Sequence, residues 1–340
     1  MNQEYNFIVK LTLSCPGNCS CCKNRQKNFE EKKYDNKPFD IHVFEQICKN
    51  IVRLRGSYVC LSGGEPTILP EIDEYIKIAK EHNLSVRINT NGWGITEEKL
   101  NKWLSYGLDQ IVLSVYSLNP NVVKQTRGNL AIYERALNAA NILKKARQSN
   151  TFMFILQTII MRDNYKEIPE LLHFAIKKSC DRFWPSYLED AINLPSVRMT
   201  EESIIEFRNI VIPKMKTIIL ENVENQSLCR SLLNDIEKYY KNPYANYHYH
   251  GDGEGCPLSG SHFTFYPNGI VDPCPGHEYF ASPYQFKINY KNIDEFMTLD
   301  TLTKYKNQVY DYCKHCPQGK HQELNLSGKA IHEHACKEEL

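Results

Sequence analysis

The chain has 340 residues, of which 42% are hydrophobic, enough to build the core of one large domain or two smaller ones. Its 41 Lys and Arg residues nearly balance 40 Asp and Glu residues, so we expect neither nucleic acid nor a membrane as a partner. We find no signal peptide and no apolar run long enough to span a bilayer, and therefore expect a cytoplasmic protein. Thirteen cysteines in a reducing compartment favour metal binding or catalysis over disulfides.

The first half of the chain alternates short apolar runs with helical patterns, which is typical of βαβ units and a parallel sheet. The pattern predicts strands at residues 7–13, 58–61, 85–89, 110–115, 152–160 and 182–187. It predicts helices at residues 41–54, 71–81, 96–106, 131–147 and 165–178. Six such strands fit an α/β fold of the (β/α)6 partial TIM barrel type, with its chemistry on the loops after the strands. We assign residues 1–190 to this domain.

A cysteine cluster follows directly after the first predicted strand. Cys15, Cys19 and Cys22 lie on one short loop. Three thiolates can bind three irons of a [4Fe–4S] cluster and leave the fourth iron open to another ligand. A structural zinc site is the competing interpretation, but such a site usually has four ligands. Cys21 lies in the same loop and its role stays open.

After about residue 190 the alternation stops. Residues 191–249 are predicted to form a helical connecting segment, with helices near 200–221 and 227–241. Residues 250–340 are predicted to form a small cysteine domain that begins with a β-hairpin around Pro267–Gly269.

The hairpin is expected to bring Cys256 and Cys274 together, and a Cys-x2-Cys pair, Cys313 and Cys316, follows about forty residues later. Four thiolates make a closed site, which on chemistry alone suits zinc or an iron–sulfur cluster. Cys336 and Cys229 have no assigned role.

Several segments around the first cluster resemble the radical S-adenosylmethionine (radical SAM) superfamily. The Cys-x3-Cys-x2-Cys loop after the first strand is similar to the loop of that family. LSGGEP at 61–66 is similar to its GGE motif, and RINTNGWG at 87–94 to its third-strand segment. VLSVYS at 112–117 with TRG at 126–128, and LQTIIMRDN at 156–164, resemble the fourth and fifth strands with their following loops.

This resemblance implies two cofactors, a [4Fe–4S] cluster on the cysteine loop and S-adenosylmethionine bound at the open iron. The GGE segment would hold the methionyl amine, Ser114 would contact the ribose, and Arg127 would pair with the cofactor carboxylate or a nearby acid. The residues expected to contact S-adenosylmethionine are Gly63, Gly64, Glu65, Asn91, Ser114 and Arg127.

The C-terminal segment resembles the twitch domain, a shortened form of the SPASM domain that carries an auxiliary [4Fe–4S] cluster. A full SPASM domain needs at least seven cysteines, and only five follow residue 250. The resemblance therefore implies one auxiliary [4Fe–4S] cluster bound by Cys256, Cys274, Cys313 and Cys316.

The function implied is reductive cleavage of S-adenosylmethionine to a 5′-deoxyadenosyl radical that abstracts a substrate hydrogen. The electron would come from a donor such as flavodoxin or ferredoxin. We favour a ribosomally synthesised peptide as substrate, with oxidative cross-linking or epimerisation as the outcome. One alternative is a dehydrogenase or epimerase of a small sugar or aminocyclitol. A second is a non-catalytic zinc or iron–sulfur binding module.

Overall fold

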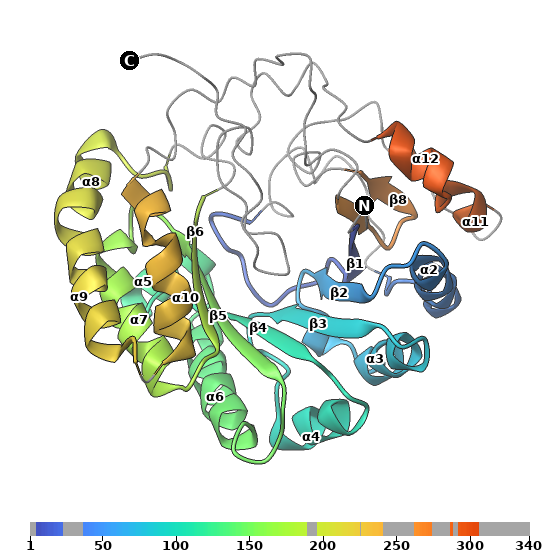
Figure 1. The fold of residues 1–340 in the computed structure, drawn as a ribbon, viewed down its shortest axis with the longest axis horizontal. Coiled ribbons are helices and arrows are strands. Elements are labelled where there is room, and N and C mark those ends of the chain that lie inside the picture. Colours follow the sequence, from blue (N-terminus) through green and yellow to red (C-terminus); the bar gives the residue numbers. More distant parts are fainter. Residues whose placement is uncertain are drawn as a thin grey trace.

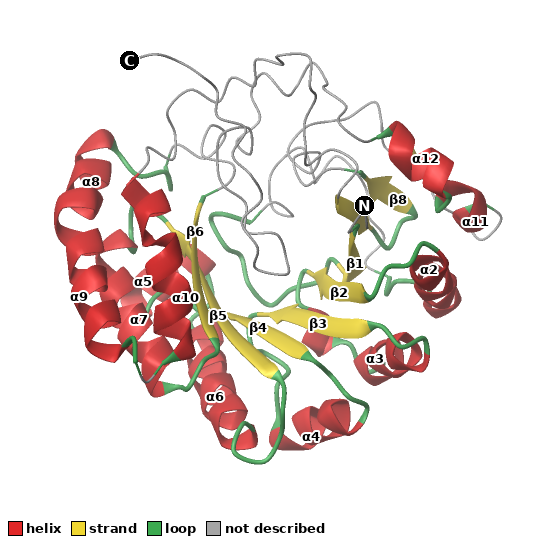
Figure 2. Ribbon diagram, viewed as in Figure 1, coloured by secondary structure: helices red, strands yellow, loops and turns green. Residues whose placement is uncertain are grey.

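A computed structural model describes residues 5–22, 37–188, 196–224, 226–240, 262–273, 286–287 and 292–305. These residues form one strongly curved sheet whose convex face is covered by helices (Figures 1 and 2). The sheet has nine strands in the order β6-β5-β4-β3-β2-β1-β7-β8-β9. Neighbouring strands from β6 through β1 to β7 are parallel, so the α/β class and the parallel sheet predicted from the sequence are confirmed.

The six predicted strands are all present, and their ends differ from the predicted ones by at most two residues. They are β1 (Asn6–Thr12), β2 (Tyr58–Gly63), β3 (Ser85–Thr90), β4 (Gln110–Ser114), β5 (Met153–Ile160) and β6 (Arg182–Tyr187). The helices that alternate with them are α2 (Ile41–Arg53), α3 (Ile72–Glu81), α4 (Glu97–Ser105), α5 (Pro120–Arg127), α6 (Ala131–Ala146) and α7 (Ile168–Lys177).

The short helix α5 was not predicted from the sequence. Its start carries local signals, because the Asn119 side chain caps the helix and Pro120 occupies its first turn. Its end is also marked, since Gly128 adopts a left-handed conformation with φ of 67°. The helix matters for the site because its last residues contact the cysteine loop.

The two faces of the sheet differ in chemistry because side chains alternate along each strand. On β3, Val86 and Ile88 are fully buried in the hydrophobic core beneath the helices. The helices contribute their own apolar residues to this core, including Trp103 of α4, whose indole N–H donates to Asp73 at 2.7 Å. The concave face carries polar residues between the apolar ones, and Arg87 of β3 is one of them.

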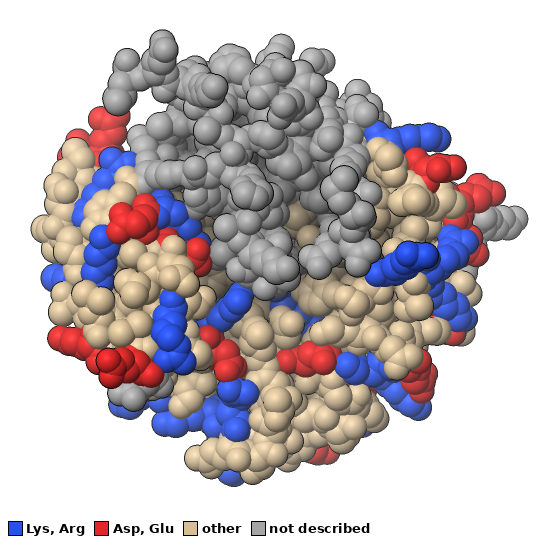
Figure 3. Space-filling view, in the orientation of Figure 1, with Lys and Arg blue, Asp and Glu red and all other residues tan. Residues whose placement is uncertain are grey.

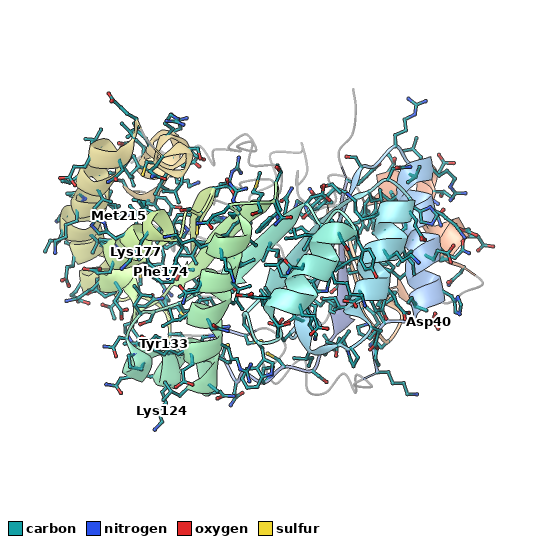
Figure 4. All side chains as sticks on the ribbon, turned by 90° about the horizontal axis from the view of Figure 1, so that it is seen from below. Asp40, Lys124, Tyr133, Phe174, Lys177 and Met215 are labelled. Atoms are coloured by element: carbon teal, nitrogen blue, oxygen red, sulfur yellow. The ribbon has the colours of Figure 1, made fainter. Side chains whose placement is uncertain are left out.

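The helical connecting segment packs beyond β6. It comprises α8 (Glu201–Glu206), a π-helical turn (Phe207–Val211), α9 (Ile212–Asn222), α10 (Ser227–Asp235) and a 3₁₀ helix (Ile236–Tyr240). Met215 of α9 is fully buried, and Figure 4 shows it on the same side as Phe174 of α7. Within the described ranges, no helix is long and apolar enough to span a membrane.

The described part of the C-terminal segment joins the same sheet. Strands β7 (His262–Phe265) and β8 (Ile270–Asp272) pair antiparallel on either side of the predicted Pro267–Gly269 turn, and β9 (Phe286–Lys287) pairs with β8. β7 runs parallel to β1, with Asn6 opposite His262, an association that the sequence pattern does not indicate.

A second connection links the C-terminal segment to the first helix. Helices α11 (Ile293–Phe296) and α12 (Leu299–Lys304) follow the strands, and α11 packs on α2. Asn50 of α2 donates to the Asp294 carboxylate at 2.6 Å, and Arg53 donates to the Met297 carbonyl at 3.1 Å. The hairpin and α11 therefore cover the edge of the sheet next to β1.

Charged residues are spread over the molecule. On the face shown in Figure 3, basic and acidic side chains of the described residues alternate, and neither sign forms a large patch. This distribution agrees with the net charge of +1.

Asp181 illustrates how polar side chains fix the strand starts, and it gives a test of the fold. Its carboxylate accepts from the Arg147 guanidinium at 2.5 Å and from the Phe154 amide at 2.7 Å. We expect Asp181→Ala to lower the free energy of unfolding by about 1.5–3 kcal/mol, the usual contribution of hydrogen bonds to a charged group.

Urea denaturation followed by circular dichroism measures this change. Asp163→Ala is the control, because Asp163 lies 4.0 Å from the guanidinium of Arg162, whose side chain is 44% exposed. We expect this substitution to change the free energy of unfolding by no more than about 0.5 kcal/mol. Equal effects of the two substitutions would contradict the role assigned to Asp181.

Candidate functional site

The loop that carries the three cysteines is held by the end of α5. The Asn18 amide donates to the Arg127 carbonyl at 2.9 Å, and the Ser20 amide donates to the Thr126 carbonyl at 2.8 Å. The Asn129 side chain donates to the Pro16 carbonyl at 2.9 Å. The backbone of the loop is therefore fixed by residues more than a hundred positions later in the sequence.

The three predicted ligand thiols are half-buried and lie on one loop. Cys15 accepts from the Gly17 amide at 3.4 Å and from the Asn91 side chain at 3.6 Å. A Cβ atom placed on Gly17 would lie 3.6 Å from the Cys15 Sγ and 3.5 Å from the Cys19 Sγ. The same Cβ would lie only 2.8 Å from the Ile132 Cδ1, so the loop packs too closely against α6 for a side chain at this position.

Cys21 is more deeply buried than Cys15, Cys19 and Cys22. Its side chain is buried in the hydrophobic core, and its thiol hydrogen-bonds with Tyr116. Burial raises the pKa of Cys21 to about 12. The structure therefore separates Cys21 from the half-buried thiols of Cys15, Cys19 and Cys22, a distinction that the sequence left open.

The electrostatics of the loop oppose thiolate formation in the absence of a metal. Burial raises the pKa of Cys15 to about 11, and the nearby Glu65, Cys19 and Cys22 add to the rise. Iron ligation requires thiolates, so binding of a cationic cluster must supply the free energy of deprotonation. Arg127 is the nearby protein cation, and its guanidinium hydrogen-bonds with the Cys19 side chain.

The turn after β2 packs tightly against the start of the cysteine loop. The Gly64 amide donates to the Thr12 carbonyl at 2.7 Å, and the Glu65 amide donates to the Ser14 carbonyl at 2.9 Å. Gly63 has a φ of 141°, and a Cβ on Gly64 would lie only 2.3 Å from the Ser14 carbonyl oxygen. Glycine is required at both positions, one for its conformation and one for the close approach.

The Glu65 carboxylate lies beneath this turn with no exposed surface. Its Oε1 accepts from the Thr67 amide at 3.1 Å, the Thr67 hydroxyl at 2.5 Å and the Thr90 hydroxyl at 2.6 Å. Its Oε2 accepts from the Asn91 amide at 2.6 Å. Burial raises the pKa of Glu65, while the four hydrogen bonds favour the ionised form and oppose the rise.

Arg127 is the second buried charge of the site. The guanidinium donates to the Ser114 carbonyl at 3.0 Å and lies 4.3 Å from the centre of the Tyr116 ring. Among the residues that the structure describes, its Nε has no hydrogen-bond partner. It therefore retains a donor for a further ligand.

The structure brings the predicted residues into two groups on either side of the cysteine loop. Gly63, Gly64, Glu65 and Asn91 lie on the β2–β3 side, and Asn91 reaches the Cys15 sulfur. Ser114 and Arg127 lie on the α5 side. Within the described ranges, no three His, Cys, Asp or Glu side chains converge closely enough to hold a single metal ion.

Sequence reasoning missed the residues that position these groups. They are Thr67 and Thr90, which donate to Glu65, and Asn18, Thr126 and Asn129, which fix the cysteine loop. Asn129 carries a weak local signal, because it also caps the start of α6 by accepting from the Ala131 amide. Thr67 also lies close to its partner in the sequence, because Glu65 caps the turn that contains it. The contacts of Thr90, Asn18 and Thr126 join distant segments and leave no local pattern.

Cys229 and the C-terminal cysteines complete the set of candidate residues. Cys229 is fully buried in α10 as part of the hydrophobic core. Cys256, Cys274, Cys313, Cys316 and Cys336 lie outside the described residues, so their ligand roles stay predictions.

The fold and the loop together define a class of protein, a parallel α/β domain with three half-buried thiols on the loop after its first strand. Residues 9–175 match the family model of the Radical SAM superfamily. The chain therefore contains a radical SAM domain, which confirms the superfamily resemblance.

Among curated proteins, the chain is similar to the PqqA peptide cyclase of Rhizobium meliloti (strain 1021). The two are 29% identical over 176 residues, which cover 52% of this chain and 45% of the relative. The chain thus matches about half the length of that curated relative.

Among solved structures, the chain is similar to Streptococcus suis SuiB bound to the precursor peptide SuiA, with a TM-score of 0.64, 16% identity, and coverage of 89% of this chain and 66% of that one. It is also similar to anSMEcpe bound to AdoMet and the Cp18Cys peptide, with a TM-score of 0.61, 16% identity, and coverage of 92% and 85%. At these identities the likeness shows the fold.

The separation of Cys21 from the other thiols gives a test of the ligand set. Simultaneous change of Cys15, Cys19 and Cys22 to Ala is expected to remove about four irons per chain, one [4Fe–4S] cluster. Cys21→Ala is the matched control and is expected to remove none, because its thiol is buried against Tyr116. Iron and sulfide are counted after anaerobic reconstitution. Loss of the same amount of iron from both variants would contradict the assignment.

Proposed function

We propose that this protein is a radical SAM enzyme that modifies a ribosomally synthesised peptide. The observation that carries the proposal is the cysteine loop, in which three half-buried thiols lie between two sets of buried polar residues. Glu65 and Asn91 border it on one side and Arg127 on the other. A protein that only binds zinc in a closed site would need neither the Glu65 and Asn91 pair nor Arg127 beside its cysteines.

The residues present fit a [4Fe–4S] cluster with bound S-adenosylmethionine. Cys15, Cys19 and Cys22 would hold three irons, and their half-buried side chains lie on one loop. When bound and reduced, this pair of cofactors supplies a 5′-deoxyadenosyl radical for hydrogen abstraction. We propose that the electron comes from a donor such as flavodoxin or ferredoxin.

The protein's own contribution is to offset the negative charge of the thiolates and to orient S-adenosylmethionine. The Asn91 side chain and the Gly17 amide donate to the Cys15 sulfur, which stabilises negative charge on that ligand. Arg127 places a buried positive charge beside Cys19, which offsets the charge of the thiolates. Its Nε is a donor for the carboxylate of S-adenosylmethionine, the role that the family resemblance implies.

Glu65 has two roles in this proposal: its carboxylate binds the methionyl ammonium, and it holds two loops together. Four protein donors already surround its carboxylate, three of them on Oε1, so Oε2 is the atom with room for the methionyl ammonium. The same carboxylate holds the loops after β2 and β3 together. Gly63 and Gly64 keep the backbone of that turn close to the cysteine loop, and Ser114 would contact the ribose.

A peptide substrate is supported by the similar proteins, whose names or titles mention peptides. They are a peptide cyclase, SuiB bound to its precursor peptide, and anSMEcpe bound to a peptide. We propose oxidative cross-linking or epimerisation as the outcome. An auxiliary cluster that accepts an electron from the substrate would favour oxidation.

Formation of 5′-deoxyadenosine tests the proposal. The reconstituted chain, with dithionite and S-adenosylmethionine under anaerobic conditions, is expected to release 5′-deoxyadenosine and methionine, detected by liquid chromatography. The variant that lacks Cys15, Cys19 and Cys22 is expected to release neither. Equal release by this variant would exclude the cysteine loop as the site of cleavage.

Glu65→Ala in the same assay tests the second part of the site. It is expected to raise the S-adenosylmethionine concentration needed for half-maximal cleavage by about ten- to a hundredfold, since it removes charge-assisted hydrogen bonds of about 1.5–3 kcal/mol. Iron content should stay unchanged, and this distinguishes lost cofactor binding from lost cluster. An unaltered concentration dependence would remove Glu65 from the cofactor site.

We further propose one auxiliary [4Fe–4S] cluster bound by Cys256, Cys274, Cys313 and Cys316. The whole chain is then expected to hold about eight irons and no stoichiometric zinc. Cys313→Ala should lower the iron count, whereas Cys336→Ala should not, because four ligands already close the site. A content of one zinc and about four irons per chain would show that these four cysteines bind zinc and not an auxiliary cluster.

A further inference from the structure

Arg87 lies on the concave face of the sheet, away from the cysteine loop. It pairs with Cys60 of β2 on one side and with Gln110 of β4 on the other. Its neighbours in sequence, Val86 and Ile88, are buried under the helices, so alternation along the strand directs the Arg87 side chain to the concave side.

The guanidinium of Arg87 is enclosed by groups that carry no formal negative charge. The residue is 2% exposed, and its Cζ lies 5.7 Å from the centre of the Tyr58 ring and 5.8 Å from that of Trp184. It also hydrogen-bonds with the Cys60 side chain. Trp184 belongs to β6, which lies three strands from β3 in the sheet. The Arg87 side chain therefore extends across the inside of the curved sheet.

Among the described residues, no carboxylate forms an ion pair with Arg87, and its Nε has no hydrogen-bond partner. Arg147, by contrast, is paired with the Asp181 carboxylate at 2.5 Å. A buried charge without an opposite charge destabilises a protein strongly. The two rings offset part of this cost through cation–π attraction, and an anion would offset more.

A second polar atom on the same face is buried. Asn89 follows Arg87 by two residues on β3, and within the described part of the chain no hydrogen-bond donor reaches its side-chain oxygen Oδ1. The two residues are separated by about 7 Å along the strand.

The residues around this pair are less buried than Arg87 itself. Tyr58, Gln110 and Trp184 are half-buried, whereas Arg87 is 2% exposed and the Asn89 Oδ1 atom is buried. The site therefore combines a buried cation and a buried acceptor with half-buried side chains around them.

We propose that Arg87 and Asn89 form a subsite for an acidic residue of the peptide substrate. Arg87 binds the side-chain carboxylate, for which its planar guanidinium provides paired donors, and Asn89 Oδ1 accepts the backbone N–H of the same residue. This inference rests on the proposed function, because it names the substrate class of that site.

Three small probes test the subsite on the reconstituted full chain under anaerobic conditions. N-acetylglutamate α-amide carries a side-chain carboxylate, N-acetylglutamine carries only a terminal carboxylate, and N-acetylglutamine α-amide carries neither. A ligand that binds the native state raises the melting temperature in proportion to its occupancy. We expect N-acetylglutamate α-amide to give the largest rise and to change the fluorescence of the chain through Trp184.

Three variants identify the residue responsible. Arg87→Met is expected to abolish the rise without lowering the melting temperature of the ligand-free protein, because it replaces an unpaired buried charge with an apolar side chain of similar length. Arg87→Lys keeps the charge but loses the paired donors, and is expected to weaken binding about tenfold. Arg135→Met is the control, since Arg135 also stacks on a tryptophan, 5.5 Å from the Trp93 ring, but on helix α6.

Several results would overturn the proposal. One is an equal rise with all three probes, and another is a full response in Arg87→Met or, if that variant fails to fold, in Arg87→Lys. A larger rise in melting temperature with N-acetylglutamine would show that the subsite binds the C-terminal carboxylate of a peptide and not a side-chain carboxylate. Loss of the response in saturating S-adenosylmethionine would assign Arg87 to the cofactor. The proposed function fails separately, when 5′-deoxyadenosine does not form although the probes bind.

Discussion

The Glu65 carboxylate has no contact with solvent, and a buried carboxylate is stable only where donors surround it. Those donors come from two separate loops, through Thr67 after β2 and through Thr90 and Asn91 at the end of β3. The backbone amide of Glu65 also binds Ser14, next to the first cysteine. One residue thus links three strand ends, the side chain joining those of β2 and β3 and the backbone amide joining that of β1, where the cysteine loop begins.

The other side of the cysteine loop is fixed by backbone contacts to the end of α5. Between these two supports, the loop directs Cys21 into the core and leaves Cys15, Cys19 and Cys22 half-buried. The protein places its cations and donors at the same thiols, through Arg127, Asn91 and the Gly17 amide. A high pKa for Cys15 in the absence of metal follows from the same burial, so cluster binding and loop geometry are coupled.

The concave face of the sheet differs from an ordinary core because its polar residues are only partly satisfied. Among the described residues, the Arg87 Nε and the Asn89 Oδ1 are buried on this face without hydrogen-bond partners, whereas the Glu65 carboxylate, in the turn after the neighbouring strand β2, accepts four hydrogen bonds. Unsatisfied buried polar groups cost free energy, and binding sites are where such a cost has a function. The hairpin that pairs with β1 extends the sheet beyond the six predicted strands.

The sequence by itself determined the six parallel strands, most of the helices, the cysteine loop and the GGE turn, because periodicity and spacing are local properties of a chain. It did not reveal α5, whose signals cover only eight residues, nor the pairing of β7 with β1, which joins segments about 250 positions apart. Tertiary structure alone decided that Cys21 turns inward, that Glu65 has four protein donors, and that Arg87 reaches Trp184 without meeting a described carboxylate. Each of these depends on which distant side chains meet in space, and no local pattern in a sequence records that.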